Sequence, residues 1–166
     1  DHASTDHTPE VIAQAKARWP NIRSYRQKKS VGIERQVSDV WRMGRGKYVI
    51  CLADDDKLIP EVLARYVRAL EKQPDVAVLY TPWFAYDDAK GEVIHGYFEI
   101  PGRTAFDVSQ ALPMIDFITA RQIFPEVAIY RSDVLHQILM TYPDAPYQPF
   151  LLAFDALTHG QVVFER

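Results

Sequence analysis

The feature that most constrains the fold is an apolar run at residues 48–52, followed almost at once by three consecutive carboxylates, Asp54, Asp55 and Asp56. The run is typical of a buried strand, and Pro60 then opens an amphipathic helix. Strands followed by helices build open α/β sheets, which bind their ligands beyond the carboxyl ends of the strands. We therefore expect the three aspartates to lie at such an end.

Three adjacent carboxylates repel one another by roughly 1 kcal/mol for each close pair even in water, and a bound divalent cation would offset that cost. Mg²⁺ and Mn²⁺ take carboxylate oxygens together with the phosphate oxygens of a substrate. The alternative is a turn or a helix cap, because aspartate suits both. An EF-hand calcium loop does not fit, since its central glycine and terminal glutamate are missing. The pattern favours a metal or phosphate site.

Composition narrows the class of protein. A chain of 166 residues with 48% hydrophobic and 25% charged residues fits one ordinary globular domain. A net charge of −3 and the lack of a long basic run argue against a nucleic-acid binder. No apolar run reaches the ~18 residues of a membrane span. The only cysteine is Cys51, which fits a reducing compartment. We expect a cytoplasmic protein, with peripheral attachment to the inner membrane face as the alternative.

Hydrophobic periodicity and turn residues predict the order of the elements. Helices and strands alternate in the first half, which is typical of a parallel sheet with covering helices. The second half is less regular and contains a predicted hairpin with a polar turn at residues 87–91. The predicted helices are 8–19, 33–43, 60–72, 134–140 and 150–158, the predicted strands are 22–25, 48–52, 76–80, 83–86, 92–98, 122–130 and 162–164, and 101–113 is a loop or a short helix.

Three stretches carry motifs whose order and spacing occur together in one known family. Residues 1–9 read D-H-A-S-T-D-H-T-P, against the pattern D-D-G-S-x-D-x-T. Residues 30–35 read S-V-G-I-E-R, loosely like N-x-G-x-x-x-A-R-N, and residues 46–60 follow G-x-Y-I-x-x-L-D-x-D-D-x-x-x-P without a gap. With these motifs the first half of the chain resembles the family 2 glycosyltransferases of the GT-A fold.

The resemblance implies a single GT-A domain over residues 1–166 that lacks the first strand and belongs to a longer protein. Its Rossmann-like central sheet would be mostly parallel and flanked by helices. The implied reaction is transfer of a sugar, with inversion, from a nucleotide-diphosphate donor to a hydroxyl of a saccharide or lipid-linked acceptor. Mn²⁺ or Mg²⁺ would bridge the diphosphate and stabilise the charge on the leaving nucleotide.

The resemblance also assigns roles to residues of the acidic motif. Asp55 falls on the aspartate that contacts the metal. Asp54 falls where a side chain reaches the ribose and can also bind the metal, and Asp56 is adjacent and holds the metal or a metal-bound water. Ala53 departs from the family, because it stands at the first aspartate of the D-x-D-D pattern.

Three further residues fall on the nucleotide side of the resemblance. Asp1 and His2 lie where the base is held, although His2 replaces the family's second aspartate. Arg35 matches the arginine that meets the nucleotide, and the alternative for Arg35 is an exposed helix residue without a ligand. Ser30 replaces an asparagine of the second motif.

The catalytic base is harder to assign. Inverting members use a carboxylate to deprotonate the acceptor hydroxyl, but the matching place at residues 147–149 reads Tyr-Gln-Pro and holds no acid. Asp144 is the nearest upstream carboxylate and is the candidate, with Asp155 as the alternative. Aromatic side chains at residues 83–86 could stack on an acceptor sugar, although aromatic residues beside a strand more often belong to the core.

Two other functions remain open from the sequence. A binding or scaffold module that has lost catalysis would explain the missing base, Ala53 and the absent first strand. A nucleotidyltransferase that makes the sugar nucleotide shares acidic metal sites, but it would normally show a glycine-rich N-terminal loop, which this chain cannot display.

Overall fold

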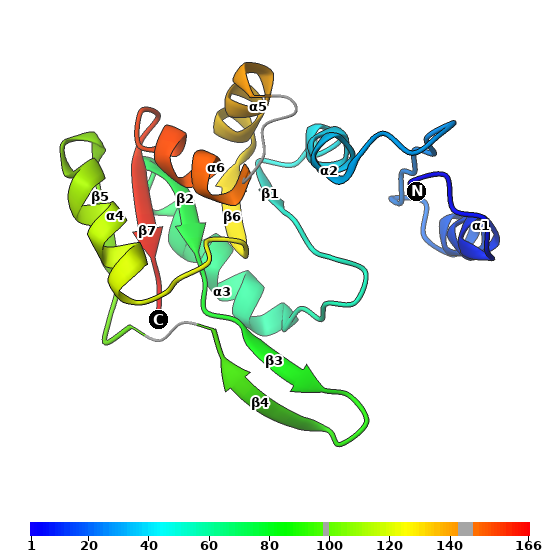
Figure 1. Cartoon of the computed structure of the whole chain (residues 1–166), viewed down its shortest axis with the longest axis horizontal. Coiled ribbons are helices and arrows are strands. Elements are labelled where there is room, and N and C mark those ends of the chain that lie inside the picture. The colour runs from blue at the N-terminus through cyan, green and yellow to red at the C-terminus, as the bar shows by residue number, and fades with distance from the viewer. Residues whose placement is uncertain (98–99, 143–147) are drawn as a thin grey trace.

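The computed structural model describes residues 1–97, 100–142 and 148–166, and it has a five-stranded sheet at its centre (Figure 1). The strand order across the sheet is β1-β6-β2-β7-β5. A separate two-stranded hairpin, β3-β4, projects from the body of the molecule. The strands are β1 Tyr48–Ile50, β2 Val76–Tyr80, β3 Phe84–Asp87, β4 Glu92–Gly96, β5 Thr104–Phe106, β6 Ala128–Arg131 and β7 Gln161–Phe164.

The α/β class with flanking helices agrees with the prediction, but the direction of strand pairing differs from it. Among the described strands of the sheet, only β2 and β7 pair in parallel, and the other three pairs are antiparallel. The reason is that β6 lies between β1 and β2 and runs against both. The alternation of consecutive helices and strands cannot reveal a late strand that inserts between two early ones.

Most helices form where the periodicity predicted them. Pro9 and Pro60 lie in the first turns of α1 and α3, where a missing N–H costs nothing. The helix α4 was not predicted as such, because the prediction for residues 101–113 is a loop or a short helix. Pro113 lies in the first turn of α4, where proline is tolerated. The predicted strand at residues 22–25 does not form. The helices are α1 Thr8–Arg18, α2 Ile33–Arg42, α3 Pro60–Glu71, α4 Ala111–Ala120, α5 Ser132–Thr141 and α6 Gln148–Ala156.

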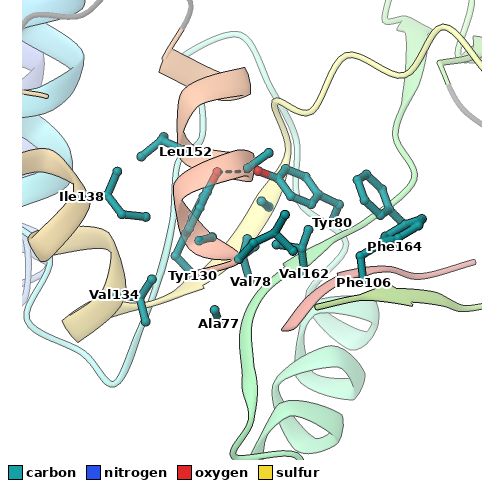
Figure 2. Close-up of a cluster of buried hydrophobic side chains, with 14 of the residues drawn as sticks. Ala77, Val78, Tyr80, Phe106, Tyr130, Val134, Ile138, Leu152, Val162 and Phe164 are labelled. Carbon is teal, nitrogen blue, oxygen red and sulfur yellow. Dashed lines mark hydrogen bonds between the residues drawn. The ribbon is translucent and has the colours of Figure 1, made fainter. Parts of the chain in front are cut away.

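The core lies on both faces of the sheet. One face packs against α3 through Tyr66 and Leu70. The other face packs against α2, α4, α5 and α6, and Figure 2 shows part of this cluster around Tyr80 and Tyr130. The hydroxyls of these two tyrosines lie 3.0 Å apart and form a hydrogen bond inside the core. This bond satisfies polar groups that burial would otherwise leave without water.

The tyrosine pair predicts a loss of stability in alkali. Burial raises the pKa of both phenols in the folded protein, because a phenolate would be desolvated there. The unfolded chain therefore loses these protons first, so the stabilisation is complete below about pH 10 and is lost as the pH rises further. Between pH 9 and 11, we expect the free energy of unfolding to fall less steeply in the double variant Tyr80→Phe/Tyr130→Phe than in the wild type. Urea titrations measure this slope, with Tyr142→Phe as the exposed control. Equal slopes in all three proteins would contradict the prediction.

Candidate functional site

The three predicted aspartates lie in the loop that joins β1 to α3, beyond the carboxyl end of β1 (Figure 1). All three are exposed. The loop folds back on itself, because the backbone N–H of Asp56 donates to the carbonyl of Ala53 and the N–H of Ala53 donates to Oδ2 of Asp56, each at 3.3 Å. Asp56 thus closes a turn. We refer to residues 51–59 as the acidic loop.

A fourth carboxylate, Glu126, was missed by the sequence analysis. Ile50 pairs with Ile129 and Tyr80 pairs with Ala128, so the residues that follow β1 meet those that precede β6 at one edge of the sheet. The pKa of Glu126 is raised, first by burial and then by the negative charges of Asp56 and Asp55. Only the register of β6 brings Glu126 to this edge, and no motif marks it in the sequence.

The gathered negative charge is compatible with a hard cation. Within residues 1–97, 100–142 and 148–166, no three histidine, cysteine or acidic side chains lie close enough to hold a metal ion by themselves. Mg²⁺ and its relatives are commonly held by one or two carboxylates and complete their shell with phosphate oxygens and water. The acidic loop offers ligands of this kind, and its charge adds to burial in raising the pKa of Glu126.

Asp1 is tied to the segment that follows α1. Its amino group donates to the carbonyl of Tyr25 at 2.8 Å, and its own carbonyl accepts from the N–H of Gln27 at 2.9 Å. The side chain is only 2% exposed, and Oδ1 accepts from the N–H of Ser4 at 2.9 Å. Oδ2 lies 3.4 Å from Nε of Arg26 but has no hydrogen-bond partner in the described part of the chain. A buried oxygen in that state can accept a hydrogen bond from a ligand.

His2 connects the N-terminal turn to the loop before α2. Its Nε2 accepts a hydrogen bond from the backbone N–H of Val31 at 2.8 Å and lies 3.2 Å from Oγ of Ser30. In this conformation His2 orders the loop that it contacts.

A hollow of about 420 Å³ adjoins this turn. Two of its lining residues meet at the carboxylate of Asp39, which accepts a hydrogen bond from Gln27 Nε2 at 3.1 Å and another from Arg35 Nε at 3.1 Å. The volume lies within the range of small-molecule pockets. We call it the α2 pocket. It is lined by Tyr25, Gln27, Val31, Glu34, Arg35 and Asp39.

The structure therefore divides the predicted site residues into two groups. Asp1, His2 and Arg35 gather at and beside the α2 pocket, through contacts with its lining residues. Residues 54–56 form the second group on the acidic loop and do not line that pocket. The candidate base, Asp144, lies outside the described residues.

Gln148 lies within residues 147–149, which match the place of the family's catalytic carboxylate, and it has a structural role. It is buried at the start of α6, and its Nε2 donates to Oγ of Ser38 at 2.6 Å and to the carbonyl of Glu34 at 3.3 Å. These bonds join α6 to α2 beside the pocket. Asp155, the alternative base, is half-buried within α6.

Comparisons with known proteins define the class. The S. aureus TarS crystal structure, covering residues 1–349 of that protein, superposes with a TM-score of 0.67 at 12% identity, over 99% of this chain and 46% of that chain. This likeness supports the GT-A fold. The family model for glycosyl transferase family 2 matches residues 1–139, and the chain belongs to that family.

Curated relatives add no assigned activity. The uncharacterized proteins Mb1547 of Mycobacterium bovis and MT1570 and Rv1520 of Mycobacterium tuberculosis are each 33% identical over 84 residues, which is 49% of this chain. The match covers 24% of each relative's length. That residues 1–166 form one domain without the family's first strand stays a prediction. In the described part of the chain, no helix is long and apolar enough to cross a membrane.

Proposed function

We propose that this protein transfers a sugar from a nucleotide-diphosphate donor to an acceptor hydroxyl, with inversion and with the help of Mn²⁺ or Mg²⁺. The observation that carries the proposal is the family 2 match over residues 1–139. The α2 pocket and the acidic loop support it, since they offer a hollow for a small ligand and carboxylates for a cation. The proposed acceptor is a saccharide or a lipid-linked molecule.

We assign the nucleobase of the donor to the α2 pocket and the residues beside it. The buried Oδ2 of Asp1 would accept an N–H of the base, because it has no hydrogen-bond partner in the described residues. His2 would hold the loop at Val31 in place while the ligand enters. Arg35 would meet the nucleotide from α2, where Asp39 orients its guanidinium. Asp39 thereby acts as a positioning residue.

On the phosphate side, Asp54, Asp55 and Asp56 would hold the cation. When bound, the cation would stabilise the negative charge that develops on the leaving diphosphate. Asp56 would keep the loop folded through its turn with Ala53, so its carboxylate has one oxygen committed to a backbone N–H. Asp54 and Asp55 are therefore the residues best able to turn their carboxylates toward a ligand.

The proposed base is Asp144, and its replacement tests the reaction. We expect Asp144→Asn to lower sugar transfer by ~10²-fold or more, the usual scale for loss of general-base help, while donor affinity changes by less than about twofold. Transfer is measured by release of the nucleotide from a panel of donors and acceptors, and donor affinity by calorimetry. Asp155→Asn, which replaces the alternative base, is measured in parallel, and Asp116→Asn on the exposed surface of α4 is the control.

Each outcome decides between named alternatives. Equal turnover in Asp144→Asn would exclude Asp144 as the base. Wild-type protein that binds a donor but turns over none of the panel would favour the binding or scaffold module instead. We also propose a cytoplasmic location. The only cysteine, Cys51, cannot form a disulfide within the chain, so the protein does not depend on an oxidising compartment.

A further inference from the structure

The β3-β4 hairpin has two different faces. Phe84 pairs with Gly96, and Tyr86 pairs with Val93. Residues that lie opposite each other in an antiparallel pair share one face. The register shifts between Ala85 and Tyr86, but exposure still alternates along β3, since Phe84 and Tyr86 are exposed and the residue that follows each is half-buried. Phe84, Tyr86 and Val93 therefore lie on the same face, which we call the hairpin face.

The opposite face belongs to the packing of the molecule. Trp83 and Tyr97 stack with ring centroids 3.6 Å apart and an interplanar angle of 12°. Trp83 is half-buried against the core, and its carbonyl accepts from the N–H of Tyr97 at 2.9 Å. Of the aromatic residues that could meet an acceptor sugar, Trp83 is thus occupied, whereas Phe84 and Tyr86 are not buried.

The hairpin face is open to solvent. Phe84 is 45% exposed, Tyr86 46% and Val93 55%. Gly96 stands opposite Phe84 and has no side chain with which to cover its ring. A flat aromatic ring that is left uncovered in this way offers a stacking surface.

This face adjoins the acidic loop. Lys57, the residue after Asp56, forms an ion pair with Asp88 at the tip of the hairpin. The same ammonium lies 5.3 Å from the ring centroid of Tyr86. A molecule on the hairpin face would therefore lie beside the loop proposed to hold the donor phosphates.

We propose that the hairpin face binds a sugar ring of the acceptor, with the ring stacked on Phe84 and its hydroxyls meeting Lys57 and the hydroxyl of Tyr86. The inference rests on the proposed glycosyltransferase function and specifies its acceptor as a saccharide. A sugar ring presents an apolar C–H face and a rim of hydroxyls. An aromatic surface with polar groups at its edge matches both.

Charge and size disfavour other occupants of this face. The hairpin carries three acids, Asp87, Asp88 and Glu92, against one lysine, Lys90, so an anionic membrane surface would be repelled. Even with Ile94, which is also exposed, the hairpin offers only a few apolar side chains. A stable protein interface buries about 800 Å² on each partner, which is more than so few side chains supply.

Saturation-transfer NMR with maltotetraose, cellotetraose and chitotetraose tests the proposal without requiring turnover. We expect the wild-type protein to transfer saturation to at least one tetrasaccharide, and Phe84→Ala to weaken that binding about fivefold. Phe84→Leu keeps an apolar side chain without a flat ring, and we expect it to weaken binding as well. Trp19→Ala, which removes an aromatic ring of similar exposure at the end of α1, is expected to bind as the wild type does.

Three results would overturn the proposal: no saturation of any tetrasaccharide, equal binding by Phe84→Ala, or a Phe84-dependent association with phosphatidylglycerol vesicles. Binding of UDP, GDP and dTDP, each with Mn²⁺, is measured on the same samples. Saccharide binding that depends on Phe84 in a protein that binds no nucleotide would support the hairpin face and contradict the proposed donor site, so the two failures are distinguishable.

Discussion

Asp55→Asn is expected to transfer sugar at least ~10²-fold more slowly than the wild-type protein, because asparagine keeps the shape of the side chain but not its charge. Binding should change in parallel. In the wild type, Mn²⁺ together with UDP, GDP or dTDP should raise the melting temperature more than the metal or the nucleotide alone. Asp55→Asn should abolish that additional rise, because the metal would lose the ligand that joins it to the protein.

Asp116→Asn is the control for this experiment, since it removes one carboxylate from the exposed surface of α4 and should keep both transfer and the additional rise. If Asp55→Asn keeps the full additional rise in melting temperature, Asp55 does not bind the metal. The same measurement on Asp54→Asn then shows whether the neighbouring carboxylate carries the metal instead.

The largest loss of stability is expected for Gly160→Ala. Gly160 lies between α6 and β7 and has a φ of +155°, a backbone conformation that residues with a side chain rarely adopt. A Cβ there would lie 2.5 Å from the carbonyl oxygen of Asp75, which already accepts a hydrogen bond from the N–H of Gln161 at 2.7 Å. The backbone on both sides is fixed, so the clash has no easy relief. We expect the free energy of unfolding to fall by ~2–4 kcal/mol, from strain and overpacking together.

Urea unfolding measures this loss, and the melting temperature should fall by about 5–15 °C in a chain of this size. Gly102→Ala is the matched control, because a Cβ at Gly102 meets no atom within 4 Å. Its free energy of unfolding should stay within ~0.5 kcal/mol of the wild type. Similar losses in the two variants would show that the contact with Asp75 does not limit stability.

Local signals in the sequence predicted most of the elements correctly. Proline and polar residues marked the starts of α1 and α3, and the polar turn at residues 87–91 marked the hairpin. The start of α4 also carried a signal, since Asp107 and Gln110 form a capping box just before it. The prediction for residues 101–113 stayed open between a loop and a short helix, and it did not use this signal.

The predictions were weaker for contacts between distant segments. Asp54, Asp55 and Asp56 are consecutive, so their common location could be seen directly in the sequence. Glu126 joins them only through the insertion of β6. Asp39 becomes the centre of the α2 pocket only because α2 packs beside Gln27. Residue spacing and composition predict neither of these contacts, since both depend on tertiary packing.

The place of β6 in the sheet also has a consequence for the order of folding. β1 pairs with β6 alone among the described strands, and about 80 residues separate the two in sequence. While the chain is being synthesised, β1 therefore has no sheet partner until residue 131 has left the ribosome. The segment that anchors the acidic loop joins the sheet late, so a pause or truncation before β6 would leave an early strand with unpaired edges.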